Sequence, residues 1–269
     1  MTDIARGTVY FVGAGPGAPD LITIRGRDLI AAADLLVYAD SLVDVALATF
    51  ARADARVVGS STLTLEKTLT LIIDAAQRGE VVVRLHSGDP ALYGAMHEQT
   101  VALRAAGVPY QVVPGVSSAF AAAAAFGIEL TVPGIAQTVI MTRAQGRASA
   151  VPARESLRQL AAHGTTLVLF LSAAIIHRAV EDLIAGGYAP DTPAAIAYRV
   201  SWEDEALFRC PLNEVEATLR THTITRQALV LVGPALALEY APDFAADARS
   251  RLYDPAYTHL FRRGEATRD

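Results

Sequence analysis

The sequence contains few of the residues that stabilise secreted or metal-centred proteins. It has one cysteine, Cys210, in 269 residues, so no disulfide can form within the chain and a disulfide scaffold is excluded. Six scattered histidines and that one cysteine give no ligand cluster with zinc spacing, so we expect no metal. Residues 1–7 contain no apolar stretch of the signal-peptide kind, and we therefore expect a cytoplasmic protein.

Long apolar runs and an excess of basic residues are also missing. The longest apolar runs, such as residues 166–171, fall far short of the ~20 residues of a membrane helix, so we expect no membrane association. The net charge of −5 and the lack of a basic run argue against a broad nucleic-acid surface, although a local arginine cluster remains compatible. Hydrophobic residues make up 52% of the chain and aromatic ones only 7%, which predicts a large core of alanine, valine and leucine.

Strand-like and helix-like segments alternate in the first half of the chain. A β-branched and aromatic run predicts a strand over residues 8–12, and residues 23–33 have helical spacing. Further strands are expected over 35–39, 56–59, 80–86 and 110–113, and helices over 65–77, 91–106 and 118–126, the last capped by a serine hydroxyl. Such alternation is typical of βαβ units and a parallel sheet.

The second half repeats the alternation with shorter spacing, which suggests a mixed sheet. Strands are expected over 138–141, 165–171, 194–200, 207–210 and 228–232, and helices over 154–162, 173–185 and 212–220. We therefore predict an α/β protein with two α/β domains, 1–134 and 135–238, a hinge near 133–138, and a polar tail over 239–269.

A glycine-rich loop, GAGPG at 13–17, follows the first predicted strand. A dinucleotide-binding turn requires the spacing G-x-G-x-x-G, and here the spacing is G-x-G-x-G. Pro16 and Pro19 also remove two backbone N–H donors that a pyrophosphate cradle would use. Asp34 and Asp40 lie at a distance suitable for a ribose-binding acid, but without the glycine spacing they count for little. The loop is either a tight turn or a ligand loop of another kind.

Other loops at predicted strand ends have similar features. They are residues 87–94, 114–118, 170–172 and 226–228. Asp89 is a ligand contact or a helix N-cap, and Ser117 and Ser118 are ligand contacts or ordinary caps. Because open α/β sheets bind ligands at the carboxyl ends of their strands, we expect the ligand to lie between the two halves.

These motifs together resemble the tetrapyrrole methylase family over about residues 8–235. The resemblance rests on VGAGPG at 12–17, DLIT at 20–23, Ala33-Asp34, Tyr38, GDP at 88–90, PGVSS at 114–118 and QA at 227–228. Within the family, the branch that methylates precorrin-4 at C-11 is the most similar. The segments that indicate this branch are YADSLV at 38–43, RLHSGDP at 84–90, TRAQGR at 142–147, WEDE at 202–205 and TRQA at 225–228.

The resemblance implies two α/β domains around a deep cleft, a homodimer, and S-adenosylmethionine as the methyl donor, with S-adenosylhomocysteine as product. The substrate would be a tetrapyrrole, precorrin-4 in cobalamin biosynthesis, with cobalt-precorrin-4 or another precorrin position as the alternative. Carried over position by position, the donor contacts are Pro16, Gly88, Asp89, Leu92, Ser117, Ser118, Leu171, Tyr198 and Ala228.

Because the donor already has an activated methyl group, the main task of the protein would be to align a nucleophilic carbon of the substrate with that methyl group. Asp40 is the first candidate for a base or for a pyrrole N–H acceptor, unless it is a solvated loop aspartate. Tyr38 orients the ring or belongs to the core, and His86 is an alternative base or a satisfied histidine at a strand end. Arginines suit the substrate carboxylates, although each could be an ordinary surface residue. They are Arg84, Arg143, Arg147 and Arg226. A non-enzymatic binding module is a further alternative.

Overall fold

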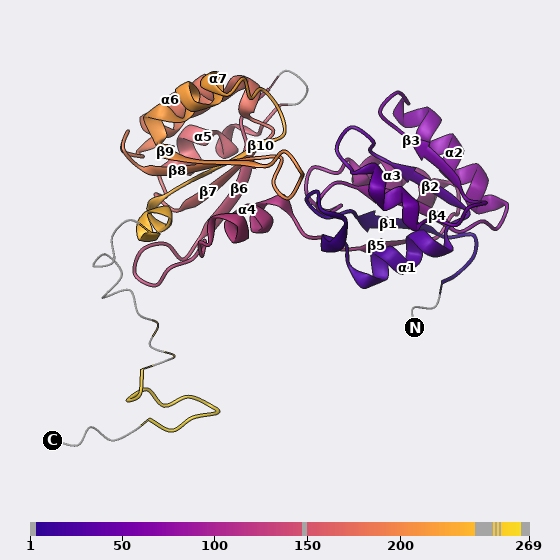
Figure 1. The fold of residues 1–269 in the computed structure, drawn as a ribbon, viewed down its shortest axis with the longest axis horizontal. Coiled ribbons are helices and arrows are strands. Elements are labelled where there is room, and N and C mark those ends of the chain that lie inside the picture. The colour runs from indigo at the N-terminus through magenta and orange to yellow at the C-terminus, as the bar shows by residue number, and fades with distance from the viewer. Residues whose placement is uncertain (1–3, 147–149, 240–249, 251, 253, 265–269) are drawn as a thin grey trace. The chain divides into compact units, whose positions relative to one another are not determined.

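The computed structural model describes residues 4–146, 150–239, 250, 252 and 254–264 (Figure 1). The chain forms two compact units. The first comprises the chain up to Ala122 together with Arg199–Glu205, and the second comprises Ala123–Tyr198 and the chain from Ala206 onward. Each unit contains one five-stranded sheet, which confirms the predicted α/β class with two sheets. The predicted boundary at 134/135 and the predicted cleft stay predictions.

The first unit is built on a parallel sheet with the strand order β3-β2-β4-β1-β5. Its strands are β1 (Val9–Gly13), β2 (Leu35–Tyr38), β3 (Arg56–Gly59), β4 (Val82–His86) and β5 (Tyr110–Val113). All five residues of β1 and of β4 are buried, as expected for central strands covered on both faces. In a parallel sheet, all carboxyl ends lie along one edge, so the loops that follow these strands share that edge.

Helices cover both faces of this sheet. They are α1 (Ile24–Ala32), α2 (Leu65–Gln77) and α3 (Met96–Ala105), whereas α4 (Ser118–Phe126) begins in the first unit and ends in the second. Thr23 and Thr64 cap α1 and α2, each accepting a hydrogen bond from the backbone N–H three residues on. The predicted start of α3 near residue 91 was wrong. Residues 91–95 form a turn, in which Tyr93 and Ala95 have φ values of 55° and 47°, so the helix begins only at Met96.

The second unit has a mixed sheet with the order β6-β7-β10-β8-β9. Its strands are β6 (Val139–Arg143), β7 (Thr166–Phe170), β8 (Pro193–Tyr198), β9 (Ala206–Pro211) and β10 (Ala228–Val232). Only β6 and β7 pair in parallel, and the other pairs are antiparallel, so the predicted mixed sheet is confirmed. The core residues of this unit also come from α5 (Leu157–Ala161), α6 (Ile176–Gly186) and α7 (Val215–Thr221).

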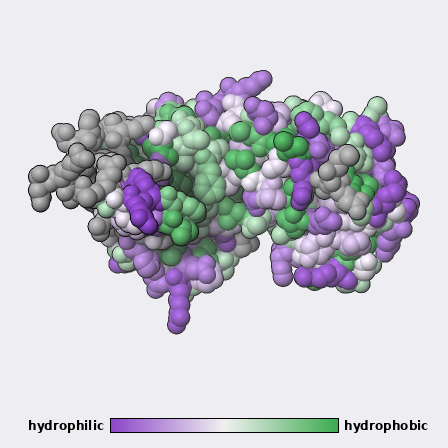
Figure 2. Space-filling view, turned by 90° about the horizontal axis from the view of Figure 1, so that it is seen from below, coloured by the Kyte–Doolittle hydropathy of each residue, from purple (hydrophilic) through white to green (hydrophobic). Residues whose placement is uncertain are grey.

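The surface mixes hydrophobic and hydrophilic residues (Figure 2). Among the described residues, no helix is both long enough and apolar enough to span a membrane. The described part of the tail contains a short bridge between His259 and Arg262.

Candidate functional site

Three glycines bring the ends of β1, β4 and β5 into backbone contact. A Cβ atom on Gly13 would lie 2.5 Å from Cα of Gly115 and 2.7 Å from the carbonyl oxygen of Gly88. Gly15 and Gly88 also exchange two backbone hydrogen bonds, of 2.8 and 3.3 Å. The family resemblance implied that Gly88 contacts the methyl donor. The close approach observed there is that of neighbouring loops, which explains why glycine is required at each of these strand ends.

Asp89 joins two of these loops through its carboxylate. Oδ2 accepts a hydrogen bond of 3.0 Å from the backbone N–H of Gly115, and Oδ1 accepts one of 2.8 Å from that of Ala91. Because α3 begins seven residues later in the chain, at Met96, Asp89 is not its N-cap. The side chain fixes the loop after β4 against the loop after β5.

The loop after β5 leads directly into α4 and offers unused donors. The buried Ser117 accepts a hydrogen bond from Ala119 N–H at 3.4 Å, which agrees with the predicted serine cap. The backbone N–H groups of Val116, Ser117 and Ser118 donate no hydrogen bond to any residue that the structure describes. Such N–H groups at a helix start attract carboxylates and hydroxyl groups.

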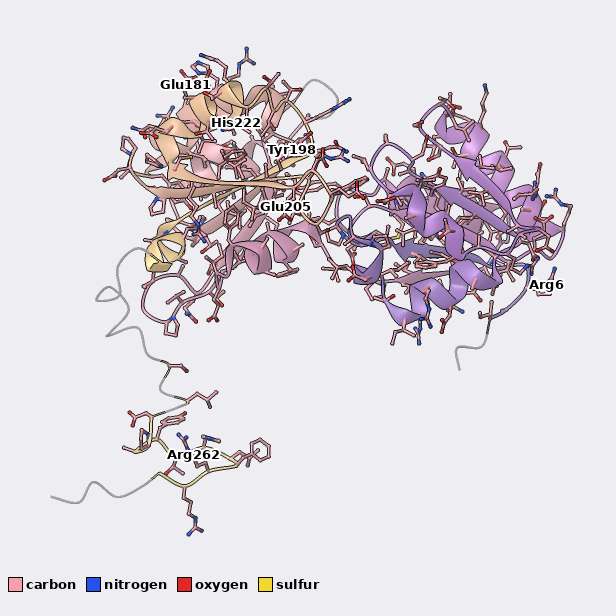
Figure 3. The ribbon with its side chains drawn as sticks, in the orientation of Figure 1. Arg6, Glu181, Tyr198, Glu205, His222 and Arg262 are labelled. Carbon is pink, nitrogen blue, oxygen red and sulfur yellow. The ribbon has the colours of Figure 1, made fainter. Side chains whose placement is uncertain are left out.

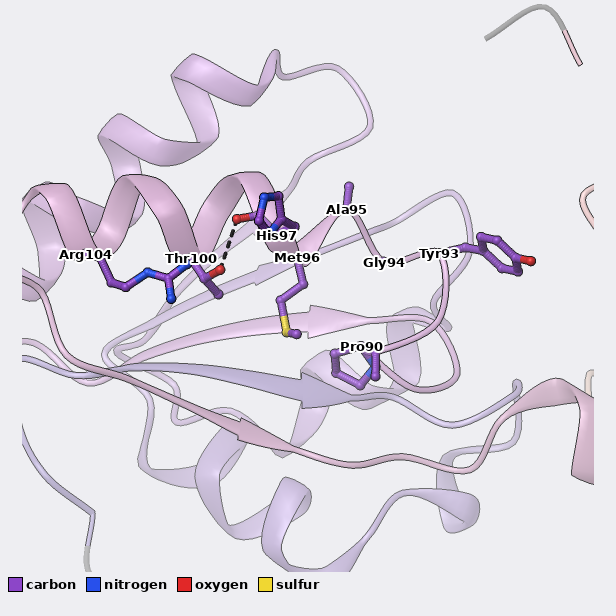
Figure 4. A pocket seen from close by; sticks show the side chains of 9 residues that line it. Pro90, Tyr93, Gly94, Ala95, Met96, His97, Thr100 and Arg104 are labelled. Carbon is purple, nitrogen blue, oxygen red and sulfur yellow. Dashed lines mark hydrogen bonds between the residues drawn. The ribbon is translucent and has the colours of Figure 1, made fainter. Parts of the chain in front are cut away.

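An open hollow of about 420 Å³ lies beside the Asp89 loop, within the first unit (Figure 4). The turn that precedes α3 and one side of α3 from its first to its last turn line it, including Pro90, Tyr93, His97 and Arg104. The positive φ of Tyr93 shapes this turn, and non-glycine residues in that region often accompany functional sites. Leu92, the predicted donor contact in this loop, does not line the hollow.

Asp40 lies just beyond β2 and is held by Ser61. Its Oδ1 accepts from the Ser61 backbone N–H and its Oδ2 from the Ser61 hydroxyl, both at 2.7 Å. These hydrogen bonds lower the pKa of Asp40 below its usual value, so the group is a carboxylate at neutral pH. A lowered pKa makes a poorer general base but leaves a good hydrogen-bond acceptor. Tyr38, at the end of β2, is half-buried against the core.

Arg84 and His86 occupy alternate positions of β4, so their side chains point to the same face of the sheet. Arg84 is 9% exposed and donates a 2.9 Å hydrogen bond to the Ser60 hydroxyl, while its Nε has no partner among the described residues. Burial lowers the pKa of Arg84 to about 10, with the Asp40 charge opposing, so the guanidinium stays charged at neutral pH. A buried cation with a free N–H is suited to binding a carboxylate.

His86 is buried next to that cation and is therefore neutral. Burial is the larger cause, and the Arg84 charge adds to it, so the pKa of His86 falls to about 3. Its Nε2 has no hydrogen-bond partner among the described residues. A histidine with so low a pKa is a weak proton acceptor, which argues against His86 as the base.

Three predicted donor contacts of the second unit meet at one edge of its sheet. Ala228 pairs with Tyr198 across β10 and β8. Leu171 is the residue after β7, which pairs with β10 on the side opposite β8. Leu171 is 69% exposed with a φ of 52°, and Gln227 has a φ of 54°. Strained, exposed backbone of this kind is typical of ligand-binding edges.

The predicted substrate arginines of the second unit are less clearly placed. Arg143 ends β6 and donates a 3.2 Å hydrogen bond to the carbonyl of Ala150. Arg226 is exposed, two residues before β10. Arg147 lies outside the described residues. The described residues also contain no cluster of three or more histidine, cysteine, aspartate or glutamate side chains that could bind a metal.

Sequence reasoning missed two groups of residues. Ser60 and Ser61 follow β3 and bind Arg84 and Asp40; the signal was a pair of hydroxyl residues at the same sheet edge. Trp202, the only tryptophan of the chain, was used only as part of the WEDE segment that indicates the family branch. Its hydrogen bond from the indole N–H to the glycine loop was not predicted.

Comparison with known proteins places this geometry in context. Residues 8–216 match the family model for Tetrapyrrole (Corrin/Porphyrin) Methylases. The chain is 44% identical over 256 residues to the cobalt-precorrin-4 C(11)-methyltransferase of Priestia megaterium, covering 95% of this chain and 98% of the relative. It is 43% identical to the precorrin-4 C(11)-methyltransferase of Pseudomonas aeruginosa, covering 96% and 100%.

Two solved structures are similar as well. The X-ray structure of a cobalamin biosynthetic enzyme, cobalt precorrin-4 methyltransferase, has a TM-score of 0.83 and 43% identity, covering 87% of this chain and 99% of that one. The uroporphyrin-III C-methyl transferase of Thermus thermophilus complexed with S-adenyl homocysteine has a TM-score of 0.72 and 29% identity, covering 86% and 99%.

Proposed function

Because the chain belongs to the tetrapyrrole (corrin/porphyrin) methylase family, we propose that it transfers a methyl group from S-adenosylmethionine to C-11 of precorrin-4 or cobalt-precorrin-4 in cobalamin biosynthesis. The observation that supports this most directly is the identity of 43–44% along almost the whole chain to relatives named for that position. The relatives divide between the cobalt-containing and cobalt-free substrate at nearly equal identity, so the proposal includes both.

The first unit suits a donor of this kind. S-adenosylmethionine supplies an activated methyl group and has a carboxylate, an ammonium and ribose hydroxyl groups. The unused N–H groups at 116–118 fit the carboxylate or a hydroxyl group, so Ser117 and Ser118 are proposed contacts through their backbone. The Asp89 carboxylate already accepts two backbone N–H groups, and we therefore assign it the positioning of the loops.

The remaining donor contacts are also proposals at this stage. They are Pro16, Gly88 and Leu92 in the first unit, and Leu171, Tyr198 and Ala228 in the second. The convergence of the last three at one sheet edge supports their assignment.

The substrate side depends on charge complementarity. The buried Arg84, with its free Nε, is proposed to bind a substrate carboxylate, and Arg143, Arg147 and Arg226 to bind others. Asp40 is proposed to accept a pyrrole N–H, since its low pKa favours that role over proton abstraction. Tyr38 is proposed to orient the ring. A homodimeric state and a cytoplasmic location complete the proposal, to be tested by light scattering and by cell fractionation.

The direct test is turnover with defined substrates. The purified chain is incubated with S-adenosylmethionine and either precorrin-4 or cobalt-precorrin-4, and the product is analysed by mass spectrometry and NMR. The expected product has one added methyl group at C-11. Methylation at another carbon would refute the position, and donor binding without any methyl transfer would support a binding module instead.

The substrate arginine has a matched control. Arg84→Gln should raise KM for the tetrapyrrole about tenfold or more while leaving KM for the donor nearly unchanged, as expected for loss of a charge-assisted hydrogen bond. Arg158→Gln, an exposed arginine on α5, should change neither constant. An equal rise of both KM values for Arg84→Gln would indicate a structural role.

A further inference from the structure

The segment Arg199–Glu205 connects β8 to β9 in the chain but belongs to the first unit. Its turn is held by its own contacts. Trp202 N–H donates to the Arg199 carbonyl at 2.9 Å, and the Arg199 guanidinium lies 4.2 Å from the Trp202 ring centre. Arg199 also donates to Asp204 at 2.5 Å, and Ser201 N–H donates to Glu205 at 2.6 Å. The segment is therefore a compact, preformed turn.

Two hydrogen bonds attach this turn to the glycine loop. The indole Nε1–H of Trp202 donates to the Pro16 carbonyl at 3.1 Å, and the Ser201 hydroxyl accepts from Ala18 N–H at 3.0 Å. They hold the loop on both sides of Gly17. A Cβ atom on Gly17 would lie 2.6 Å from Trp202 Nε1 and 2.9 Å from Ser201 Oγ. The last glycine of the G-x-G-x-G sequence thus makes room for the indole.

The backbone of the turn is strained in a way that the contacts explain. Arg199 has a φ of 44° and Ser201 a φ of 65°, a region that non-glycine residues rarely adopt. Such conformations persist when surrounding contacts over-determine them, and they concentrate where a segment has a functional task. The turn also begins directly after Tyr198, a proposed donor contact, and ends at Glu205 (Figure 3).

We propose that Arg199–Glu205 is a strap that holds the glycine loop in the conformation that receives the methyl donor, with Trp202 and Ser201 as positioning residues. The inference rests on the proposed function for the identity of the ligand. A loop with glycines at 13, 15 and 17 has many accessible backbone conformations, and ordering it on binding would reduce affinity. A strap that orders the loop beforehand removes that cost.

The first test measures donor-product affinity in matched variants. Ser201→Ala and Trp202→Phe each remove one hydrogen bond between the strap and the loop, and Glu203→Gln alters an exposed neighbour on the same turn. Calorimetric titration with S-adenosylhomocysteine should show about three- to tenfold weaker binding for the first two variants. The melting temperature should change little, and Glu203→Gln should bind like the parent chain. Unchanged affinity in both strap variants would overturn the proposal.

A second test is a double-mutant cycle on the contact between Gly17 and Trp202. Gly17→Ala should weaken S-adenosylhomocysteine binding about tenfold or more in the parent chain, because the new methyl group collides with the indole. In a Trp202→Ala background the same change should cost less than about threefold. An equal loss in both backgrounds would show that the indole is not what requires a glycine.

A ligand-free measurement separates this inference from the proposed function. Hydrogen exchange at the Ala18 amide should be about tenfold faster in Ser201→Ala than in Glu203→Gln, since the amide loses its acceptor. If the parent chain binds no S-adenosylhomocysteine, the proposed function fails, whereas equal exchange rates at Ala18 would refute the strap itself.

Discussion

The buried His86 should make the stability of the chain fall steeply in mild acid. Its side chain is 5% exposed, lies 5.7 Å from the Phe11 ring, and is close to the charged Arg84. Burial and that charge lower its pKa from about 6.5 to about 3. A histidine whose pKa is depressed in the folded state stabilises the fold fully above the unfolded pKa, and this stability is lost as the pH falls through the window from about 6.5 to 3.

The magnitude follows from the two pKa values. At pH 7.5 the histidine is neutral in both states, but at pH 5.0 only the unfolded chain has bound the proton. This difference lowers the free energy of unfolding by about 2 kcal/mol between the two pH values. Because pH 5.0 is far above 3, any folded-state pKa below about 4 gives nearly the same loss.

The assay is urea denaturation at pH 7.5 and pH 5.0, followed by circular dichroism. His86→Phe keeps a ring in the same space but has no titrating group. Between pH 7.5 and pH 5.0, its free energy of unfolding should therefore fall by about 2 kcal/mol less than that of the parent chain. His163→Gln removes an exposed histidine and should retain the parent pH dependence. Parallel pH dependence in the parent chain and His86→Phe would refute the reasoning, because it would mean that His86 titrates alike in both states.

Three further predictions concern the sheet edge of the first unit. Gly115→Ala should destabilise the fold by about 1–3 kcal/mol in urea denaturation, because its Cβ would lie 2.7 Å from Gly13 Cα, whereas Gly146→Ala, whose Cβ would have no atom of the described residues within 4 Å, should change little. Asp89→Asn should lower the free energy of unfolding by about 1–2 kcal/mol in the same assay, since one backbone N–H would face an amide NH₂. An unchanged free energy of unfolding would refute the role of Asp89 in joining the loops. Ser61→Ala should raise the pKa of Asp40 toward its usual value in an NMR titration, and an unchanged pKa would show that the hydroxyl is not what lowers it.

Local patterns predicted the elements of the fold closely where local forces decide them. The ranges of β3, β5, β10, α2 and α4 agree with the sequence expectation to the residue. The start of α3 differs for a physical reason. Asp89-Pro90 has the local features of a helix start, but the Asp89 carboxylate bonds to Gly115, 26 residues away, and that bond holds a turn in place of the first helical turn. A tertiary hydrogen bond overrides local propensity there.

In the candidate site, too, local sequence patterns identified single residues but not the partners that the fold brings to them. Position after a predicted strand was enough to single out Asp40, and Arg84 was singled out as an arginine suited to the substrate carboxylates. Ser61, the partner of Asp40, lies 21 residues later in the chain, and Ser60, the partner of Arg84, lies 24 residues earlier. No spacing rule connects either pair. Trp202 and Pro16 are separated by 186 positions in the chain, so the sequence pattern gives no indication of the strap. Partnership across a sheet edge depends on strand order, which the sequence pattern does not contain.

The glycine loop shows physically why this chain does not use it as a pyrophosphate cradle. Such a cradle needs free backbone N–H groups, but here Ala14, Gly15 and Ala18 already donate theirs, to His86, Gly88 and Ser201 respectively. Pro16 has none to give, so Gly17 alone among residues 14–18 has an N–H without an acceptor among the described residues. The free donors are instead at 116–118, at the start of α4. The donors available to an anionic group therefore lie one strand along the sheet from the glycine loop, at the end of β5.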